Sequence, residues 1–270
     1  MRPNVKIGTT SYGFRYLLHD ERRAPSLVSI VESARGYGLD CLQVCENARP
    51  LDLSPRQWDD VLHSARNIGL EVRMGCMTLD LGTLDRYLER TAMIPDSSLR
   101  IVLEETGRGR PARAELERFL DAAAPRLQAA GIALAVENHF DIPCRVLAEV
   151  AAPYPPSLIG FCLDSANSLR NFESPNQVFD YLGSRAMFYH LKDYKVSGTN
   201  VGFTVTGATL GSGDLDLDGF LEKVFVRTPE PLILLENWVP ATGDWDTDVE
   251  EDSRWLRLAV ESLSRMLERQ

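Results

Sequence analysis

A short stretch near the middle of the chain joins an apolar run to side chains that can bind metal ions or move protons. The run Ala-Leu-Ala-Val occupies positions 133–136, and Glu137, Asn138 and His139 follow it directly. Short apolar runs that end on polar residues are typical of strands buried on both faces of a parallel sheet. Three later runs have the same design and end on a carboxylate or an imidazole: Asp164, His190 and Glu236. This repetition is the strongest functional signal in the sequence.

The four strand-end residues have the ligand chemistry of a metal site. Three carboxylates and one imidazole suit a hard or borderline divalent cation, with Mn²⁺ or Mg²⁺ preferred and Co²⁺ or Zn²⁺ as alternatives. Without a cation, three carboxylates placed so close together would repel one another. We therefore predict one divalent cation bound by Glu137, Asp164, His190 and Glu236. In the alternative interpretation, each residue is a separate polar strand end that hydrogen-bonds to a neighbouring loop.

Three residues close to these ligands are predicted to bind a substrate. His139 and Lys192 continue the alternation of the strands before them, so both side chains should point toward the metal ligands. His139 would orient a ligand or touch the substrate, and Lys192 would polarise a substrate carbonyl. Asn167 follows Asp164 by three residues and would either hydrogen-bond to the substrate or cap a helix.

Two aromatic residues follow the first predicted strand, within the sequence Ser-Tyr-Gly-Phe at positions 11–14. Tyr12 and Phe14 would each offer a ring to the face of a sugar, and we predict both as substrate-binding residues. The alternative is that these rings only fill the inside of the barrel.

Apolar runs predict eight strands, at 4–10, 40–45, 71–76, 99–104, 132–137, 158–164, 186–191 and 231–236. Helical patterns alternate with them, at 25–36, 54–68, 83–93, 112–130, 142–152, 175–183, 216–226 and 249–268. Alternation of this kind implies right-handed βαβ units and a parallel sheet. Eight such units in 270 residues predict an α/β fold with one domain, a (β/α)₈ TIM barrel over residues 1–270. A doubly wound open sheet is the alternative, but it usually has fewer strands at this length.

The direction of side chains along the strands supports a closed barrel. Residues two apart on a strand share a face. Counting back by twos from the four ligands reaches mostly small or aliphatic residues: Ala135, Ala133, Cys162, Gly160, Phe188, Ala186, Leu234 and Leu232. These residues should fill the barrel below the ligands. The opposite set should face the helices: Leu134, Val136, Phe161, Leu163 and Leu235.

Two segments are longer than a simple connection requires. Residues 193–215 contain five glycines and an alternating Phe-Thr-Val-Thr sequence, which predicts a loop or hairpin over the barrel mouth. Long loops in that place usually act as lids or substrate walls. Residues 238–252 end in an acidic run, which we interpret as the first turn of the last helix.

Charge and composition argue against a nucleic-acid partner, a membrane partner and secretion. The formal charge of −10 opposes a nucleic-acid partner, because affinity for phosphates depends on basic residues. No apolar run approaches the roughly 20 residues of a membrane span, so no membrane partner is expected. The start of the chain lacks the pattern of a secretory signal, and the odd number of cysteines, five, predicts reduced thiols. We therefore expect a cytoplasmic protein; a homodimer is left open.

A glycine-rich loop after the fourth strand has the spacing of a dinucleotide fingerprint, with Gly107 and Gly109 followed by Ala112. Pro111 interrupts this pattern, and the loop is one of eight equivalent connections. We expect no nucleotide cofactor.

With these motifs the chain resembles the xylose isomerase-like TIM-barrel superfamily, the sugar phosphate isomerase/epimerase group that includes D-tagatose 3-epimerase. The resemblance spans the barrel, but its motifs lie in the second half: Glu137-Asn138-His139, Leu163-Asp164-x-x-Asn167, His190-Leu191-Lys192-Asp193, Gly211-x-Gly213 and Leu235-Glu236-Asn237. The motifs are specific for the superfamily and select poorly among its reactions.

The resemblance implies an activity and roles for individual residues. In epimerases of the group, Glu, Asp, His and Glu hold the metal, and the two glutamates move a proton on opposite faces of a substrate carbon. This implies Glu137 and Glu236 as catalytic residues. Ketose epimerases commonly have a histidine where this chain has Asn167, and an arginine after the seventh strand where it has Lys192 and Lys195.

We therefore predict a divalent-metal-dependent isomerase or epimerase that transfers a proton next to the carbonyl of a small sugar, keto-sugar or polyol-derived carbonyl compound. A dehydratase of a keto-cyclitol or dehydroshikimate type is the near alternative, because it begins with the same proton removal. An endonuclease IV-like phosphodiesterase fits poorly, since that relative needs three metals and many histidines and this chain has four. A non-catalytic sugar-binding barrel is the last alternative, and the presence of both glutamates opposes it.

Overall fold

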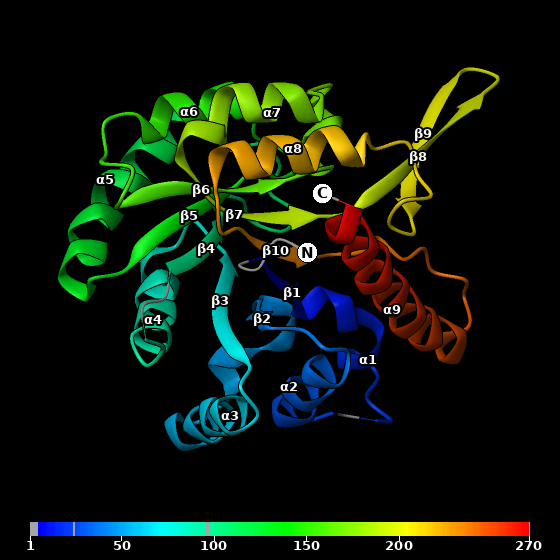
Figure 1. Ribbon diagram of the computed structural model, residues 1–270. Helices are drawn as coiled ribbons and strands as arrows, with labels where there is room; N and C mark the ends of the chain where they lie inside the picture. Colours follow the sequence, from blue (N-terminus) through cyan, green and yellow to red (C-terminus); the bar gives the residue numbers. More distant parts are fainter. Residues whose placement is uncertain (1–4, 24, 96–97, 270) are drawn as a thin grey trace.

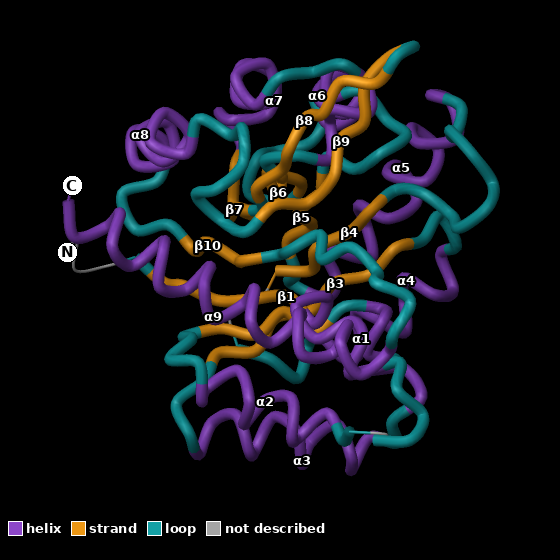
Figure 2. The backbone as a smooth tube through the Cα atoms, turned by 90° about the vertical axis from the view of Figure 1, so that its right-hand side faces the viewer, coloured by secondary structure: helices purple, strands orange, loops and turns teal. Residues whose placement is uncertain are grey.

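Eight parallel strands form a closed barrel at the centre of the molecule (Figure 2). The computed structural model describes residues 5–23, 25–95 and 98–269. The barrel strands are β1 Lys6–Thr10, β2 Cys41–Val44, β3 Glu71–Met77, β4 Ser98–Val102, β5 Ala133–Glu137, β6 Ile159–Asp164, β7 Ala186–Leu191 and β10 Leu232–Leu235. Their order around the barrel is β1-β10-β7-β6-β5-β4-β3-β2. The predicted TIM barrel is confirmed. Position 4 of the first predicted strand lies outside the described residues.

Helices surround the barrel (Figure 1). Their bounds are α1 Arg15–Leu18, α2 Leu27–Gly36, α3 Pro55–Asn67, α4 Leu81–Thr91, α5 Arg113–Ala130, α6 Cys144–Ala151, α7 Pro175–Leu182, α8 Leu217–Arg227 and α9 Trp245–Arg269. Two of them, α3 and α7, begin with a Ser-Pro pair in which the serine hydroxyl accepts a backbone N–H and a glutamine side chain completes a capping box. The short α1 was not predicted, and α9 begins before the predicted position 249. Across the described ranges, each helix is too short or too polar to cross a membrane.

The barrel interior contains most of the side chains that the alternation predicted, but the prediction for Ala186 is wrong. A register irregularity between β6 and β7 places Ala186 against the outer core and Met187 against the interior cluster. A compact buried cluster inside the barrel is formed by Cys41, Ala135, Cys162, Phe188, Leu232 and Leu234. The opposite set of strand side chains packs in the layer between strands and helices, with Leu134, Val136, Phe161, Leu163 and Leu235 among its members. All five cysteines are buried free thiols, as expected. This apolar cluster lies below the four strand-end residues Glu137, Asp164, His190 and Glu236.

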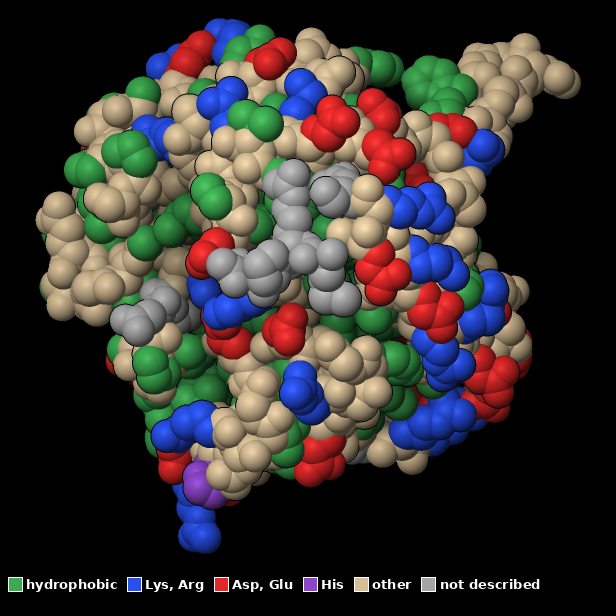
Figure 3. Space-filling view, viewed as in Figure 1, with side chains coloured by type: hydrophobic (Ala, Val, Ile, Leu, Met, Phe, Trp, Pro, Cys, Tyr) green, Lys and Arg blue, Asp and Glu red, His purple; other side chains and the backbone are tan. Residues whose placement is uncertain are grey.

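The segment after β7 is an antiparallel hairpin, which confirms one of the two forms predicted for it. Strands β8 Asp193–Thr199 and β9 Gly202–Ala208 pair along their whole length and project away from the barrel (Figure 1). Figure 3 shows the hairpin standing out from a surface on which charges of both signs are spread; residues 196–208 themselves carry no charge. At its base, Gly207 lies so close to the Trp238 carbonyl that an added Cβ would be 1.9 Å from the oxygen.

Helix α9 is attached to the start of the chain through a buried carboxylate. Asp252 accepts a hydrogen bond of 2.7 Å from the backbone N–H of Tyr16, and its side chain is buried beside Asp248 and Arg15. Burial raises the pKa of Asp252 to about 7, since little water is present to solvate its charge. The folded state therefore binds this proton more tightly than the unfolded state does.

This carboxylate predicts a pH-dependent stability difference. Because the folded pKa lies above the unfolded value, stability is lost as pH rises from about 4 to about 7 and stays lower above that range. Asp252→Asn cannot ionise, and its amide oxygen can still accept the Tyr16 N–H. We expect it to raise the free energy of unfolding at pH 8, by at most about 4 kcal/mol, and to give no gain at pH 4.

The measurement is chemical denaturation of both proteins at pH 4 and pH 8. Glu261→Gln, at an exposed position of the same helix, is the matched control and should show no pH-dependent gain. An Asn variant that is less stable than the parent at pH 8 would contradict the prediction.

Candidate metal centre

Four side chains from neighbouring strands converge at the barrel mouth. Glu137 ends β5, Asp164 ends β6, His190 lies in β7 and Glu236 follows β10 directly. One ligand atom from each of these buried residues lies within 4.8 Å of the others. The strands β5, β6, β7 and β10 are adjacent in the barrel, so their carboxyl ends bring the four residues together. The structure thus assembles the cluster that the strand-end pattern predicted.

Two ligand atoms in this cluster are buried with unused hydrogen-bonding capacity. Nδ1 of His190 and Oδ2 of Asp164 form no hydrogen bond of good geometry to any described residue. Nδ1 of His190 lies 3.3 Å from Glu137 Oε2 and 3.4 Å from Glu236 Oε2. A neutral imidazole that turns its lone pair toward carboxylate oxygens is unfavourable unless a cation lies between them. These atoms therefore fit a divalent cation.

Other buried residues hold the ligands in this orientation. Nε2 of His190 lies 3.0 Å from the amide oxygen of Gln43, across the barrel, which leaves Nδ1 to face the cluster. Asn138 donates to the backbone oxygen of Asp164 and accepts its backbone N–H, at 2.9 and 2.8 Å. The backbone N–H groups of Ala166 and Asn167 occupy Oδ1 of Asp164, so Oδ2 points inward. Such partners fix the direction and tautomer of metal ligands.

Two buried cations neutralise part of the negative charge. Arg100, only 2% exposed, bonds Glu137 through Nε and also approaches Glu46. Lys192, 1% exposed, lies 2.5 Å from Glu236 and 2.9 Å from Asp164. Counted with Glu46, four carboxylates meet these two cations. A divalent cation beside a neutral imidazole would bring this group to zero net charge.

The ionisation of the carboxylates follows their partners. Burial acts to raise the pKa of Glu137, but the charge of Arg100 outweighs it and holds that pKa well below its ordinary value. Burial opposes ionisation of Glu236 as well, yet Lys192 lowers its pKa to about 2. For Asp164, burial prevails over Lys192 and the pKa is raised. The two glutamates are therefore anionic at neutral pH, and Asp164 would gain most from a nearby cation.

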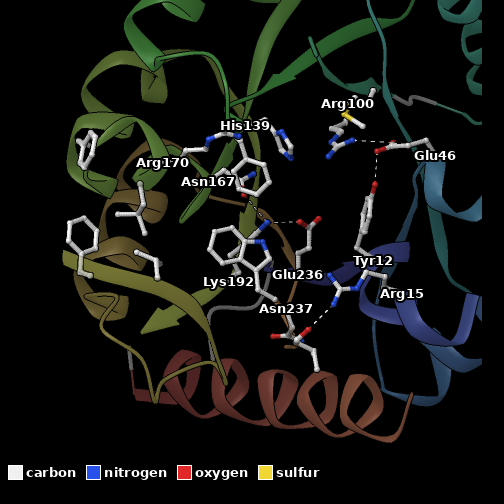
Figure 4. A pocket seen from close by; sticks show the side chains of 18 residues that line it. Tyr12, Arg15, Glu46, Arg100, His139, Asn167, Arg170, Lys192, Glu236 and Asn237 are labelled. Carbon is white, nitrogen blue, oxygen red and sulfur yellow. Dashed lines mark hydrogen bonds and ion pairs between the residues drawn. The ribbon is translucent and has the colours of Figure 1, made fainter. Parts of the chain in front are cut away.

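A pocket of about 670 Å³ opens above the cluster (Figure 4). Its lining is Tyr12, Arg15, Glu46, Met77, Arg100, His139, Phe140, Asn167, Leu169, Arg170, Phe172, Lys192, Phe203, Val205, Glu236, Asn237, Trp238 and Val239. Of the four clustered residues, only Glu236 belongs to this lining. Phe203 and Val205 come from β9, so the hairpin forms part of the pocket wall.

The structure places four of the five predicted substrate-binding residues in the pocket wall: Tyr12, His139, Asn167 and Lys192. Phe14 is a correction. The 3₁₀ turn Ser11–Phe14 rotates its ring away from the barrel mouth, and it is buried against Tyr37, with ring centroids 6.2 Å apart. Asn167 links the two parts of the site, because it donates to Glu137 at 2.9 Å and lies 3.3 Å from the Lys192 ammonium.

Sequence reasoning missed the contributions of the first half of the barrel. Gln43, Glu46, Arg100 and Glu104 all contact site residues; Glu104 lies 2.7 Å from Nδ1 of His139. One signal was available: Arg100 is a charged residue in the middle of an apolar strand, on the same strand face as Glu104. Its partners could not be identified, because they lie on other strands.

Comparison with known proteins places the chain among related barrels. A family model described as xylose isomerase-like TIM barrel matches residues 31–259. Among curated proteins, the chain is 27% identical over 267 residues to 3-oxo-isoapionate decarboxylase of Pectobacterium atrosepticum, covering 96% of this chain and 95% of that protein.

Two solved structures show the same fold at low identity. D-psicose 3-epimerase of Clostridium cellulolyticum H10, solved with D-tagatose, superposes with a TM-score of 0.72 at 13% identity, over 97% of this chain and 98% of that one. A xylose isomerase-like TIM-barrel protein of Mycobacterium smegmatis in complex with magnesium has a TM-score of 0.71 at 12% identity, over 97% of this chain and 99% of that one. At these identities the likeness concerns the fold.

The cluster predicts that the protein binds one Mn²⁺ per chain through these side chains. Asp164→Ala and His190→Ala should each weaken Mn²⁺ binding by at least about 10²-fold, because each removes a ligand whose free atom faces the cluster. Equilibrium dialysis with metal analysis measures the affinity, and circular dichroism checks the fold.

Asp218→Ala, an exposed carboxylate of α8, is the control and should leave binding unchanged. Full Mn²⁺ affinity in both ligand variants would show that the cation binds elsewhere or through other groups.

Proposed function

We propose that this chain, which belongs to the family of xylose isomerase-like TIM barrels, is a divalent-metal-dependent lyase that decarboxylates a 3-oxo sugar acid. One observation carries the proposal: only one side of the cluster is open to a substrate. There, Glu236 and the buried ammonium of Lys192 face the pocket. Decarboxylation needs a polarised carbonyl and one proton donor, whereas epimerisation needs a proton-transfer group on each face of a carbon.

Glu137 is closed off from the pocket. Arg100 and the imidazole of His190 approach its Oε2, and the Asn167 amide donates to its Oε1 at 2.9 Å. Its side chain has no exposed area, while that of Glu236 is 9% exposed. A carboxylate surrounded in this way acts as a fixed anionic ligand. To remove a proton from a substrate, it would have to leave these partners.

The reaction can be written with the residues that face the pocket. A cation held by Glu137, Asp164, His190 and Glu236 would polarise the substrate ketone as a Lewis acid. The bond between the carboxylate carbon and C2 breaks, carbon dioxide leaves, and the electron pair moves toward the ketone oxygen as an enolate. The Lys192 ammonium then gives a proton to C2, which restores the ketone, and the resulting amine regains a proton from water. No oxidant or reductant is required.

The walls near Lys192 favour loss of a charged carboxylate as a neutral gas. The Lys192 ammonium lies 5.0 Å from the centre of the Trp238 ring, and Phe140 packs beside Trp238 at 5.9 Å between ring centroids. Apolar walls solvate a carboxylate poorly and carbon dioxide well, so they would lower the barrier to C–C cleavage. The similarity to 3-oxo-isoapionate decarboxylase over nearly the full length of both chains supports the same reaction class.

Epimerisation or isomerisation of a ketose, the activity predicted from the sequence, is the second candidate. Its support is that both glutamates occupy the expected places and that epimerases share the fold. It requires Glu137 to become available on the second face of the substrate carbon. The small-molecule carbohydrate substrate and the metal dependence are common to both proposals.

Lys192 gives the sharpest test by substitution. Lys192→Met should lower kcat for carbon dioxide release from a 3-oxo sugar acid by at least about 10², because the proton donor and a nearby positive charge are lost. Carbon dioxide is measured continuously, and bound Mn²⁺ is quantified in each preparation. Lys195 is an exposed lysine of β8 that forms an ion pair with Asp214. Lys195→Met is the matched control and should retain activity. Unimpaired release by Lys192→Met with metal bound would refute the role.

Deuterium labelling separates the two reactions. In deuterated water the proposed lyase should release carbon dioxide and place one deuterium on a single face of C2, because Lys192 approaches from one side. It should not exchange the C–H bonds of a panel of ketoses. NMR spectroscopy of product and recovered substrate gives both results. Rapid exchange in ketoses, without decarboxylation of any 3-oxo acid in the panel, would favour the epimerase instead.

A further inference from the structure

A second polar group lies in the pocket on the side away from Lys192 (Figure 4). Tyr12, Glu46 and Arg100 form a hydrogen-bonded chain there, which we call the distal triad. The Tyr12 hydroxyl donates to Glu46 Oε1 at 2.8 Å, and Arg100 Nη1 lies 3.4 Å from Glu46 Oε2. The three residues come from the 3₁₀ turn after β1, the 3₁₀ turn after β2, and β4. They contribute nothing to the proton transfer described above.

Glu46 presents a hydrogen-bond acceptor to this side of the pocket. Its Oε1 is tightly bound by Tyr12, but the contact of Oε2 with Arg100 is long, so Oε2 retains capacity for another donor. Burial raises the pKa of Tyr12 above its ordinary value, which keeps its hydroxyl protonated as a donor. The Glu46 side chain is 22% exposed, whereas Arg100 is 3% exposed. The accessible group is therefore a carboxylate oxygen, with a guanidinium behind it.

We infer that the distal triad binds the uncharged hydroxyl groups at the end of the substrate that does not react, and that it excludes substrates phosphorylated there. A carboxylate accepts hydrogen bonds from hydroxyls, and the guanidinium edge can donate to the same diol. The inference rests on the proposed function only in placing the reacting carbonyl at the metal centre.

The charge directly beside Glu46 opposes an anion. Arg15, another cation on this side of the pocket, directs its guanidinium to the Tyr16 hydroxyl and the Val239 carbonyl. Arg100 is shared between Glu46 and Glu137, so its positive charge is already matched by two carboxylates. A phosphate brought to this place would meet the Glu46 oxygen at short range, and like charges in a poorly solvated pocket repel strongly. The reacting carboxylate of a sugar acid avoids this side for the same reason and lies toward Lys192.

The spacing fits a short polyol chain. One guanidinium group bridges Glu137 of the metal centre and Glu46 of the triad, so the two subsites are separated by the width of a single planar group. Hydroxyls a few carbons beyond the polarised ketone would reach Glu46, whereas a three-carbon ketone would not. Chain length should therefore be recognised here.

The test compares ligands that share the metal-binding hydroxyketone and differ beyond it. Calorimetry on the Mn²⁺-loaded protein gives the affinities of D-fructose and dihydroxyacetone, as probes with and without distal hydroxyls. Glu46→Gln should weaken the binding of D-fructose by about tenfold and leave the affinity for dihydroxyacetone unchanged, because only the longer ligand reaches the carboxylate. Tyr12→Phe removes the donor that orients Glu46. It should lower the ratio of the affinity for D-fructose to the affinity for dihydroxyacetone, as Glu46→Gln does.

A charged probe distinguishes recognition from a merely structural effect. The parent protein should bind D-fructose 6-phosphate more weakly than D-fructose, and Glu46→Gln should reduce or reverse this preference because the repelling charge is gone. Glu105→Gln, an acidic residue after β4 that is paired with Arg108 and lies outside the pocket lining, is the matched control and should leave both ratios unchanged.

Two results would overturn the inference. One is an unchanged ratio of the affinities for D-fructose and dihydroxyacetone in Glu46→Gln. The other is tighter binding of D-fructose 6-phosphate than of D-fructose by the parent protein. Neither depends on turnover. Failure to release carbon dioxide would count against the proposed lyase alone, and these binding ratios would still decide the role of the distal triad.

Discussion

Confinement of negative charge at the barrel mouth is the constraint on which the rest of this site depends. Glu137, Asp164 and Glu236 are each buried, and their ligand atoms lie within 4.8 Å of one another and of His190. Buried like charges cannot coexist without compensation, since neither water nor distance screens them. Arg100 and Lys192 supply part of the compensation, and the uncoordinated atoms of Asp164 and His190 point to where a divalent cation would supply the remainder.

The closed barrel divides this work between its two halves. The second half, with β5, β6, β7 and β10, provides the four residues of the candidate metal centre, because four consecutive barrel strands end in metal-competent side chains. The first half provides the partners that orient and balance them: Gln43 for the imidazole, Thr10 for Glu236 at 3.0 Å, and Arg100 for Glu137. An open sheet would separate Thr10 from Glu236 and Gln43 from His190, whereas Arg100 and Glu137 lie on the neighbouring strands β4 and β5. Closure therefore supplies the hydrogen-bond partners of Glu236 and His190.

The compensation also makes the site unequal on its two sides, and this inequality bears on the reaction. One glutamate is sealed beneath an arginine and an amide, and the other faces the pocket beside a lysine. Related barrels share the fold at only 12% identity, and the shared fold does not fix the reaction. Under the proposed function, the reaction is set by which side chains of the candidate metal centre can exchange protons with a substrate. The proposed lyase and the distal triad are both consequences of that local asymmetry.

Much of this molecule was predictable from sequence, and the reason is local. The apolar runs and their alternation with helices predicted the eight barrel strands. Their period of two predicted the inward stack that includes Ala135, Cys162, Phe188 and Leu234, and the clustering of the four strand-end residues, because strand geometry alone sends alternate residues to one face. Short-range signals such as the Ser-Pro helix starts were equally readable. Only the tertiary structure decided which distant residues meet. It rotated Phe14 into the core, brought Arg100 onto Glu137 and Glu46, and left Glu236 as the open glutamate. Those outcomes depend on barrel closure and on competition among buried charges, which act between strands and leave no pattern along the chain.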